Sequence, residues 1–418
     1  MHVWLLHIGE DLPVDGEVRK YRYGYLADAL VARGHSVVRW APTFRHTTKT
    51  HRFKTDCRVE INPRYHIEFL HANGYRRNVG FRRLWTNRAL GMRLRERLDG
   101  ESPPDVIVAA IPSLEWADAA TAYGRSRGIP VVVDVRDVWP DVFYNALPRA
   151  TRPAGRLLFA PYRRLARRAC RRATAITGVS QEYVDWALRL AGRSAAASDL
   201  VMPLGFDPPA TSSSKIAQHV NQLRDRGIDL QRPSCFFAGL FERSYDLETV
   251  VRAARFLDGS GQREVQFLLC GDGAKMPAIR RLASGLANVH LLGWVAPAML
   301  QAAASISSIG LCAYAVDATQ SLPNKPFEYM ASELAVVSSL QGELATILER
   351  QACGLTYQAG NSQSLSDALQ HLLQHPTKLR AMQVRARTTW AENYRSSKIY
   401  QRFVQVLESR ALLTHCAA

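Results

Sequence analysis

The stretch "SLPNKPFEYMASELAVVSS", residues 321–339, combines a helix start, two charged side chains and an apolar strand. Pro326 has a fixed backbone angle that suits the first turn of a helix, and the apolar residues after it recur at helical spacing. Glu328 therefore falls in the first turn of a predicted helix. A carboxylate there has a structural explanation, because it complements the positive end of the helix by about 0.3 to 1 kcal/mol. The alternative is that Lys325 and Glu328 face a ligand, and the rest of the chain must distinguish the two.

Short apolar strands alternate with amphipathic helices on both sides of this stretch. In the first half, strands are predicted at 3–8, 36–40, 106–110, 131–135 and 175–178, and helices at 21–33, 114–126 and 156–172. In the second half, strands are predicted at 235–238, 265–270, 289–291, 309–313, 336–338 and 354–356, with helices between them. Residues 202–214 contain proline, glycine and serine and separate the halves. The rhythm predicts an α/β chain with two doubly wound, Rossmann-like domains.

Polar residues and glycines follow most of the predicted strands. Ligands of open α/β sheets bind beyond the carboxyl ends of the strands, so these segments are the candidate site. They are residues 9–16, 111–113, 136–141, 239–245, 271–275, 315–328 and 339–343. With the two sheets facing each other, a cleft between the domains would collect all of them.

In the first half, Gly9 and Gly16 flank the loop after the first strand. Glycine allows a ligand to approach the backbone closely, and it also serves ordinary tight turns. The loop lacks the G-x-G-x-x-G spacing of dinucleotide-binding proteins. Arg136 and Asp137 directly follow another apolar strand. They form either an ion pair at a turn or a site where a carboxylate acts as a base or orients a hydroxyl group.

In the second half, Gly239 ends one strand, and the helix that follows could accept a diphosphate through the backbone N–H groups of its N-terminus. Arg243 adds positive charge nearby. Gly271 and Gly273 follow the next strand in "CGDG". Each pattern alone is a generic turn, but their succession in one half of the chain indicates a nucleotide site there.

The net charge of +17 is concentrated in the first half. Residues 1–200 contain 33 lysines and arginines against 20 aspartates and glutamates. Two segments, 75–98 and 152–172, mix arginine with leucine, phenylalanine and tyrosine, as segments that dock on anionic lipid do. Nucleic acid and plain solvated helix faces are the alternatives. We expect an anionic membrane surface as partner and no nucleic acid.

Cysteine spacing, the length of apolar runs and absent motifs limit the cellular compartment and the reaction classes that we expect. The seven cysteines form no CxxC pair, which favours a reducing cytoplasm, and no metal-ligand spacing occurs, so no metal is expected. Apolar runs are shorter than the ~20 residues of a membrane-spanning helix, and the start lacks the pattern of a secretory signal. The chain contains no Asp-x-Asp and no P-loop motif, which disfavours metal-dependent sugar transferases and P-loop nucleotidases.

The motifs "GLFER", "LLCGDGAKMPAIRRLASGLANVHLLGWV", "SLPNKPFEYMASELAVVSS" and "GELATILERQACGLTY" resemble, in order and spacing, the nucleotide-sugar domain of retaining GT-B glycosyltransferases of family 4. In the first half, "RGHSVV", "VVVDVRDVWPD" and "MPLGFD" are similar to the acceptor domain of bacterial members that build O-antigen, capsule or exopolysaccharide, including the N-acetyl-fucosamine transferase type. The segment "TTWAENYRSSKIYQRFVQVL" is similar to the final helices of the family. The resemblance implies an acceptor domain at 1–205, a donor domain at 206–385 and helices at 386–418 that pack back on the first domain.

The resemblance also implies roles for residues. Glu328 would bind the ribose hydroxyl groups, and Lys325 would stabilise the diphosphate as it leaves. Gln320 stands where the first glutamate of the family's Glu-x7-Glu pair is expected, and the family's phosphate lysine is replaced by "ERSYD", so Arg243 or Lys325 must serve. The implied set has three groups: catalytic Asp137, Lys325 and Arg243; donor-binding Glu328, Gly239, Gly271, Gly273, Asn324 and Gln320; and acceptor-side Gly9, Gly16 and Arg136.

The implied function is a retaining transfer of a sugar from a nucleotide-sugar, expected to be UDP-linked, to a lipid-linked or saccharide acceptor. It would serve surface polysaccharide or lipopolysaccharide biosynthesis at the inner face of the cytoplasmic membrane, without a cofactor. Two alternatives stay open. One is a catalytically weak scaffold in a polysaccharide assembly, which the replacement at Gln320 motivates, and the other is a nucleotide-sugar epimerase of the same fold.

Overall fold

The chain divides into two compact units in a computed structural model that describes residues 1–16, 20–76, 80–145, 147–259 and 265–415. Unit 1 comprises Met1–Pro203 with Ser397–Ala418, and unit 2 comprises Leu204–Ser396. The sequence analysis placed its boundaries at 205 and 385. Residues 386–396 lie in unit 2 because helix α15 (Pro376–Asn393) packs against helix α12 (Lys325–Ala331) and strand β15 (Ala335–Ser338) of that unit.

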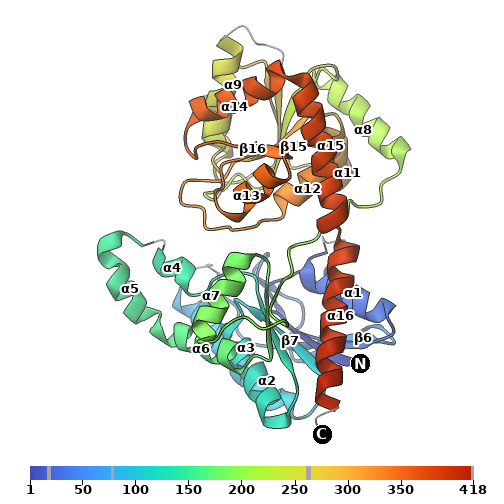
Figure 1. The fold of residues 1–418 in the computed structure, drawn as a ribbon, viewed down its shortest axis with the longest axis vertical. Helices are drawn as coiled ribbons and strands as arrows, with labels where there is room; N and C mark the ends of the chain where they lie inside the picture. The colour runs from blue at the N-terminus through green and yellow to red at the C-terminus, as the bar shows by residue number, and fades with distance from the viewer. Residues whose placement is uncertain (17–19, 77–79, 146, 260–264, 416–418) are drawn as a thin grey trace. The chain divides into compact units, whose positions relative to one another are not determined.

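Unit 1 is built on a sheet in the order β10-β9-β8-β7-β1-β2-β6-β5, parallel except for the β5–β6 pair (Figure 1). Its strands are β1 His2–Leu6, β2 Ser36–Pro42, β5 Cys57–Asn62, β6 Tyr65–Leu70, β7 Val106–Ile111, β8 Val131–Val135, β9 Ala175–Gly178 and β10 Leu200–Val201. A separate antiparallel pair joins β3 (Phe44–Arg45) and β4 (Thr50–His51). The central strands are apolar and buried, as strands covered on both faces must be. Strand β1 pairs with β2 on one side and with β7 on the other, since Val3 lies opposite both Val37 and Val106. The strand order therefore reverses between β1 and β7.

Helices cover the sheet of unit 1. They are α1 Arg22–Ala32, α2 Phe81–Leu98, α3 Leu114–Arg127, α4 Asp141–Asn145, α5 Arg152–Leu158, α6 Ala160–Arg172, α7 Gln181–Ala191 and α16 Ser396–His415, with short 3-10 turns at Pro13–Asp15 and Arg149–Thr151. The C-terminal helix α16 lies beside α1 in Figure 1, and Tyr400 stacks on Tyr25 with ring centroids 5.5 Å apart. Phe403 and Val404 are fully buried in the same core as β1.

Unit 2 has a wholly parallel sheet in the order β13-β12-β11-β14-β15-β16. Its strands are β11 Ser234–Ala238, β12 Gln266–Cys270, β13 Val289–Gly293, β14 Ile309–Cys312, β15 Ala335–Ser338 and β16 Gly354–Thr356. Its helices are α8 Ser213–Asp225, α9 Leu247–Gly259, α10 Met276–Leu282, α11 Pro297–Ser305, α12, α13 Glu343–Arg350, α14 Ser362–Gln374 and α15. These helices cover both faces of the sheet (Figure 1), and two apolar clusters are buried in this unit. The strand order reverses between β11 and β14, which is where ligands of such sheets bind.

The predicted fold class is confirmed in both units, since each is a doubly wound sheet between helices. Every strand predicted in the second half is present. Within the described part of the chain, no helix combines the length and the apolar character that crossing a bilayer requires.

Candidate active site

The two strand-end loops of unit 2 touch through glycine. Gly271 has a φ of 143°, and a side chain there would place its first carbon 1.8 Å from the carbonyl oxygen of Gly239. Gly273, at a φ of 155°, would meet the carbonyl oxygen of Phe241 at 2.7 Å. Only glycine fits at these two positions, because the backbones of the two loops are in contact. The ends of β11 and β12 therefore present main chain rather than side chains.

The backbone N–H groups of these glycines are not available to a ligand. The Gly239 N–H donates to the Cys270 carbonyl (2.9 Å), and the Gly271 N–H donates to the Gly293 carbonyl (2.8 Å). The Gly273 N–H donates to Asp272 Oδ1 (2.7 Å). Their donors are used inside the protein, so the glycines permit close approach of a ligand while another group must supply positive charge.

The N-terminus of α9 is also occupied. Asp246 accepts hydrogen bonds from the backbone N–H of Thr249 (3.1 Å) and from its hydroxyl group (2.6 Å). A carboxylate cap both uses an N–H donor and repels an anion. This cap weighs against a diphosphate at the start of α9, and the expected site there stays a prediction.

Lys325 supplies a cation at the reversal point. It begins α12, its ammonium group donates to the carbonyl of Ala238 at the end of β11, and it lies 4.9 Å from the ring centroid of Phe237 and 4.8 Å from that of Tyr245. A side-chain carbon added at Gly239 would lie 2.4 Å from Lys325 Nζ. The ammonium group thus occupies the space beside the glycine where β11 ends.

Glu328 lies one helical turn further along α12 and is half-buried. Its neighbour Tyr329 accepts a hydrogen bond from the Ala238 N–H through its hydroxyl group (3.2 Å). Lys325 and Tyr329 therefore fasten the first turn of α12 to the end of β11, with Glu328 between them. Asn324 precedes the helix, but its side chain makes no capping hydrogen bond.

The loop between β14 and α12 contains two unsatisfied polar atoms. Gln320 Oε1 and Ser321 Oγ are both buried and lack a hydrogen-bond partner among the residues that the structure describes. Leaving a buried polar atom unpaired costs about 1 to 3 kcal/mol, and such sites commonly mark a missing partner. A ligand with hydroxyl groups could supply the partners. Sequence reasoning selected Gln320 but overlooked Ser321.

Arg243 is displayed on the surface. Its side chain is 90% exposed and pairs with Asp317 Oδ2 at 2.9 Å, itself 61% exposed. The two residues belong to the loops after β11 and β14, so Arg243 is near the reversal point in topology. Surface pairs of this kind contribute 0 to about 1 kcal/mol.

The corresponding point of unit 1 is filled by charged side chains. Glu10, just after β1, is buried and accepts hydrogen bonds from Arg39 Nη2 (2.8 Å), from Arg136 and from the Tyr23 N–H (3.1 Å). His7 lies 3.2 Å from Arg136 through its Nε2 atom. Burial and these two arginines lower the pKa of His7 well below its usual range, so the ring is neutral. Arg136 is therefore held by an ion pair, and Glu10 rather than Asp137 is its partner.

Asp137 is half-buried at the end of β8. Its carboxylate accepts hydrogen bonds from the Val138 N–H (2.9 Å) and from the indole N–H of Trp139 (3.1 Å). Burial raises the pKa of Asp137 above its ordinary value, although these hydrogen bonds and Arg136 pull it down. A carboxylate with a raised pKa is a better base than an exposed one.

The two acceptor-side glycines differ in environment. Gly9 is exposed, and its N–H donates to His7 Nδ1 (3.2 Å). Gly16 ends the loop at a φ of 87°, a conformation that favours glycine, and nothing lies within 4 Å of the position of a side chain there. Gly16 is thus required by the turn.

Glu10 and Arg39 were missed from the sequence, although a signal existed. Arg39 interrupts the apolar strand "SVVRWAP" and is 1% exposed. A charge buried in a strand demands a partner, and Glu10 is the acidic residue that follows the neighbouring strand.

Two sequence-family models match the chain. Residues 23–207 match the model described as Glycosyltransferase Family 4, and residues 232–375 match the one described as Glycosyl transferases group 1. The chain is a glycosyltransferase. No curated protein sequence matches it significantly.

Solved structures show that this glycosyltransferase has the GT-B fold. Sucrose-phosphate synthase from Thermosynechococcus elongatus is 15% identical, with a TM-score of 0.71 and 98% of each chain covered. Anabaena HepE in complex with UDP is 15% identical, with a TM-score of 0.65 and coverage of 98% of this chain and 100% of that one. An E. coli trehalose-6-phosphate structure bound with UDP-2-fluoro glucose is 14% identical, with a TM-score of 0.69 and coverage of 97% and 99%.

Proposed function

We propose that this glycosyltransferase moves a sugar from a UDP-sugar to a lipid-linked saccharide acceptor with retention of configuration, in the synthesis of a bacterial surface polysaccharide. The observation that carries the donor assignment is the arrangement in unit 2. Lys325 lies beside Gly239 at the point where the strand order reverses, and Gln320 Oε1 lacks a partner in the loop that leads to it. Structures of the same fold hold UDP and UDP-2-fluoro glucose, which favours UDP as the donor nucleotide.

In this proposal the donor is recognised piece by piece. Glu328 accepts hydrogen bonds from the ribose hydroxyl groups, and Lys325 stabilises the diphosphate. Gln320 and Ser321 pair with hydroxyl groups of the sugar, which would satisfy their buried oxygen atoms. Charge-assisted hydrogen bonds to the ribose and to the diphosphate are the strongest of these contacts.

The transfer itself needs few protein groups. The bond from the anomeric carbon to the diphosphate breaks and its electron pair leaves with the diphosphate, while the acceptor oxygen forms a bond to the same face of that carbon. The acceptor proton passes to the departing phosphate oxygen. Lys325 stabilises the charge that develops on the diphosphate, and Asp137 orients the acceptor hydroxyl group. We expect no metal ion to be needed, because the lysine supplies the positive charge.

Support for a lipid-linked acceptor comes from unit 1. Phe81 and Trp85 on α2 are 84% and 74% exposed, beside the basic face of that helix. Arg93 and Arg95 of α2, however, pair with Asp56 and Asp118, so part of the basic segment 75–98 serves the fold. Residues 77–79 of this segment lie outside the described residues. We propose that the exposed aromatic residues of α2 rest on the inner face of the cytoplasmic membrane.

The testing experiment incubates the full chain with a panel of nucleotide-sugars, with and without lipid-linked acceptor, and detects released nucleotide and product by mass spectrometry. Nucleotide release that requires the acceptor and persists in EDTA supports the proposal. Release without acceptor, with epimerised sugar, would instead indicate the epimerase. Absence of release with every donor would favour the scaffold, and activity that is lost in EDTA and restored by magnesium or manganese would contradict the metal-independent mechanism.

A further inference from the structure

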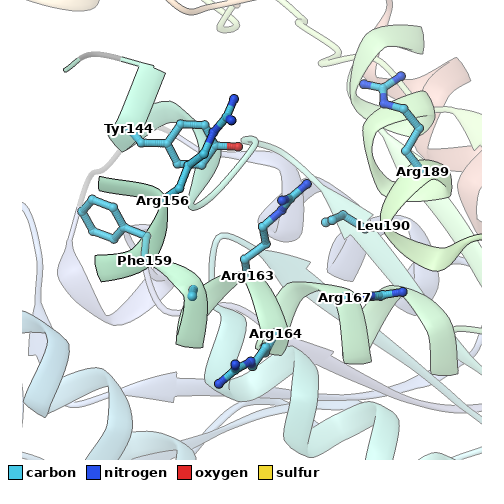
Figure 2. Close-up of a pocket in the computed structure, with 9 residues that line it drawn as sticks. Tyr144, Arg156, Phe159, Arg163, Arg164, Arg167, Arg189 and Leu190 are labelled. Atoms are coloured by element: carbon cyan, nitrogen blue, oxygen red, sulfur yellow. The ribbon is translucent and has the colours of Figure 1, made fainter. Parts of the chain in front are cut away.

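Unit 1 contains a cavity of about 410 Å³ whose lining includes no residue of the strand-end segments. Helices α4, α5, α6 and α7 contribute its lining, which Figure 2 shows as sticks. The lining residues are Tyr144, Arg156, Phe159, Ala160, Arg163, Arg164, Arg167, Arg189 and Leu190. Five of these nine residues are arginines and none is acidic. In Figure 2, Arg163 extends between Tyr144 and Arg156 on one side and Leu190 and Arg189 on the other.

The arginines on the two faces of α6 differ in their ion pairing. On the face toward α3, Arg168 and Arg172 donate to Asp118 Oδ1 at 2.8 and 3.1 Å. On the cavity face, Arg163, Arg164 and Arg167 are exposed, and none is ion paired with any carboxylate that the structure describes. Asp141, which begins α4, accepts the indole N–H of Trp186 (2.9 Å) and interacts with the cavity-lining Tyr144, but it is not itself a lining residue. Asp118 thus pairs with the arginines on the α3 face, whereas the nine residues that line the cavity include no carboxylate.

Two exposed apolar side chains lie on the helix that contributes Arg156 to the cavity lining. Leu157 and Leu158, at the end of α5, are 79% and 64% exposed, and they lie in sequence between Arg156 and Phe159, which both line the cavity. Two neighbouring leucines are rarely left exposed in a protein that only meets water. A ligand with a hydrocarbon part beside an anionic group matches this combination.

Aromatic rings connect the cavity with Asp137. Trp139 donates its indole N–H to Asp137 and lies 4.5 Å from Phe143 between ring centroids. Phe143 stacks on Phe159 at 5.4 Å, and Phe159 lines the cavity. The cavity is therefore linked through three rings in contact to the carboxylate that we assign to the acceptor hydroxyl group.

We propose that this arginine cavity binds the diphosphate of the lipid-linked acceptor, with its hydrocarbon chain beside Leu157 and Leu158 and its saccharide directed toward Asp137. The inference rests on the proposed function for its acceptor. Guanidinium groups bind phosphate oxygens through paired hydrogen bonds, and several of them match the charge of a diphosphate better than that of a single carboxylate. The cavity has the size of a site for one small headgroup.

The test measures binding of the full chain to three kinds of vesicle: neutral phosphatidylcholine alone, the same lipid with a few per cent of a polyprenyl diphosphate, and the same lipid with phosphatidylglycerol of equal total charge. The cavity variant is Arg163→Gln with Arg167→Gln. The control variant is Arg125→Gln with Arg171→Gln, which removes the same charge from exposed positions outside the cavity. Melting temperatures of both variants should stay near wild type, because all four side chains are exposed.

We expect the cavity variant to lose at least tenfold in affinity for the polyprenyl diphosphate vesicles, while the control keeps most of it. We also expect soluble inorganic diphosphate to compete for wild-type binding. Equal losses in the two variants, or equal affinity of the wild type for both anionic vesicles, would show a general lipid surface and overturn the inference. Because binding is read without turnover, a chain that binds the lipid diphosphate but transfers no sugar would refute the proposed function alone.

Discussion

The two units use the same topology to build opposite kinds of strand-end site. In unit 1, the reversal between β1 and β7 is filled by Glu10, Arg39 and Arg136, whose charges are paired below the surface. In unit 2, the reversal between β11 and β14 is lined by the backbone of Gly239 and Gly271, with a lysine ammonium group beside it. One site is thus made of side chains that satisfy each other, and the other of main chain with a cation.

This difference indicates a division of labour. A bare backbone lets a charged ligand such as a nucleotide diphosphate approach closely, and in the proposed function Lys325 provides its counter-charge. In unit 1 the paired side chains hold Arg136, and its neighbour Asp137 is fixed by the Val138 N–H and the Trp139 indole, which suits the orientation of a neutral hydroxyl group. The comparison predicts that substitutions at the strand ends of unit 1 mainly lower stability, whereas substitutions at those of unit 2 mainly lower the turnover rate.

The largest effect is expected where charges are buried in unit 1. Glu10→Gln leaves Arg39 and Arg136 without their carboxylate and should lower the free energy of unfolding by about 3 to 5 kcal/mol. Chemical unfolding followed by circular dichroism measures this. Glu408→Gln is the matched control, since Glu408 is partly exposed, pairs with Arg33 and His35 and should cost about 1 kcal/mol. If the two substitutions lower the free energy of unfolding equally, the buried charges at the strand ends of unit 1 have no special role in stability.

Lys325→Met should reduce kcat by about 10²- to 10³-fold, because a group that stabilises developing charge is lost while the side-chain stem remains. Lys275→Met is the control within unit 2. Lys275 likewise binds a backbone carbonyl, that of Tyr245 at 2.9 Å, and it pairs with Glu248 of α9, away from the end of β11 that Lys325 contacts. Its replacement should leave kcat nearly unchanged. Similar kinetics for both variants would show that Lys325 is a structural lysine.

Asp137 should give the acid limb of the pH profile. Its pKa is raised by burial, so the ionised form is lost as the pH falls through a value above the ordinary 3.8, and turnover should fall with it. Asp137→Asn should lower kcat/KM about 10- to 100-fold, the equivalent of one charge-assisted hydrogen bond, and abolish that limb. The test is the pH dependence of kcat/KM for the wild type and for Asp137→Asn. If the variant keeps the same acid limb, that limb belongs to another group.

Arg243→Gln should have the smallest effect. The exposed pair with Asp317 contributes at most about 1 kcal/mol, so the KM for the donor should change less than about fivefold. Donor titration with initial-rate measurement tests this. A loss above tenfold would mean that the surface arginine closes on the diphosphate and shares the role of Lys325.

The fold was predictable because buried parallel strands appear in the sequence as short apolar runs. The runs at 235–238 and 309–313 predict β11 and β14 directly. The β5–β6 pair was missed because Cys57–Asn62 is an edge strand whose residues alternate between half-buried and exposed, with charges in between. An alternating pattern is weak evidence when the search is for a parallel sheet.

The sequence predicted the candidate site as a set of strand-end segments, but it did not predict the contacts within them. Glycines after strands and the charged start of α12 mark the unit 2 site, whereas the use of the Gly239 N–H by Cys270 depends on the neighbouring strand. The same limit applies to the basic segment 152–172. Nothing in the sequence of this segment distinguishes Arg167 from Arg168. Arg168 faces the packed side of the helix because it pairs with Asp118, which lies some fifty residues earlier in the chain.

The most direct test of the central claim is the affinity of UDP for Glu328→Gln, measured by calorimetric titration beside the melting temperature of the free protein. The account predicts at least a tenfold loss of affinity, since a charge-assisted bond to ribose contributes about 1.5 to 3 kcal/mol, with a melting temperature close to wild type. Glu333→Gln, in the turn that follows this helix and paired with Arg380 at the surface, should bind UDP as the wild type does. Unchanged UDP affinity in Glu328→Gln would make this residue a helix-end charge and contradict the donor site in unit 2.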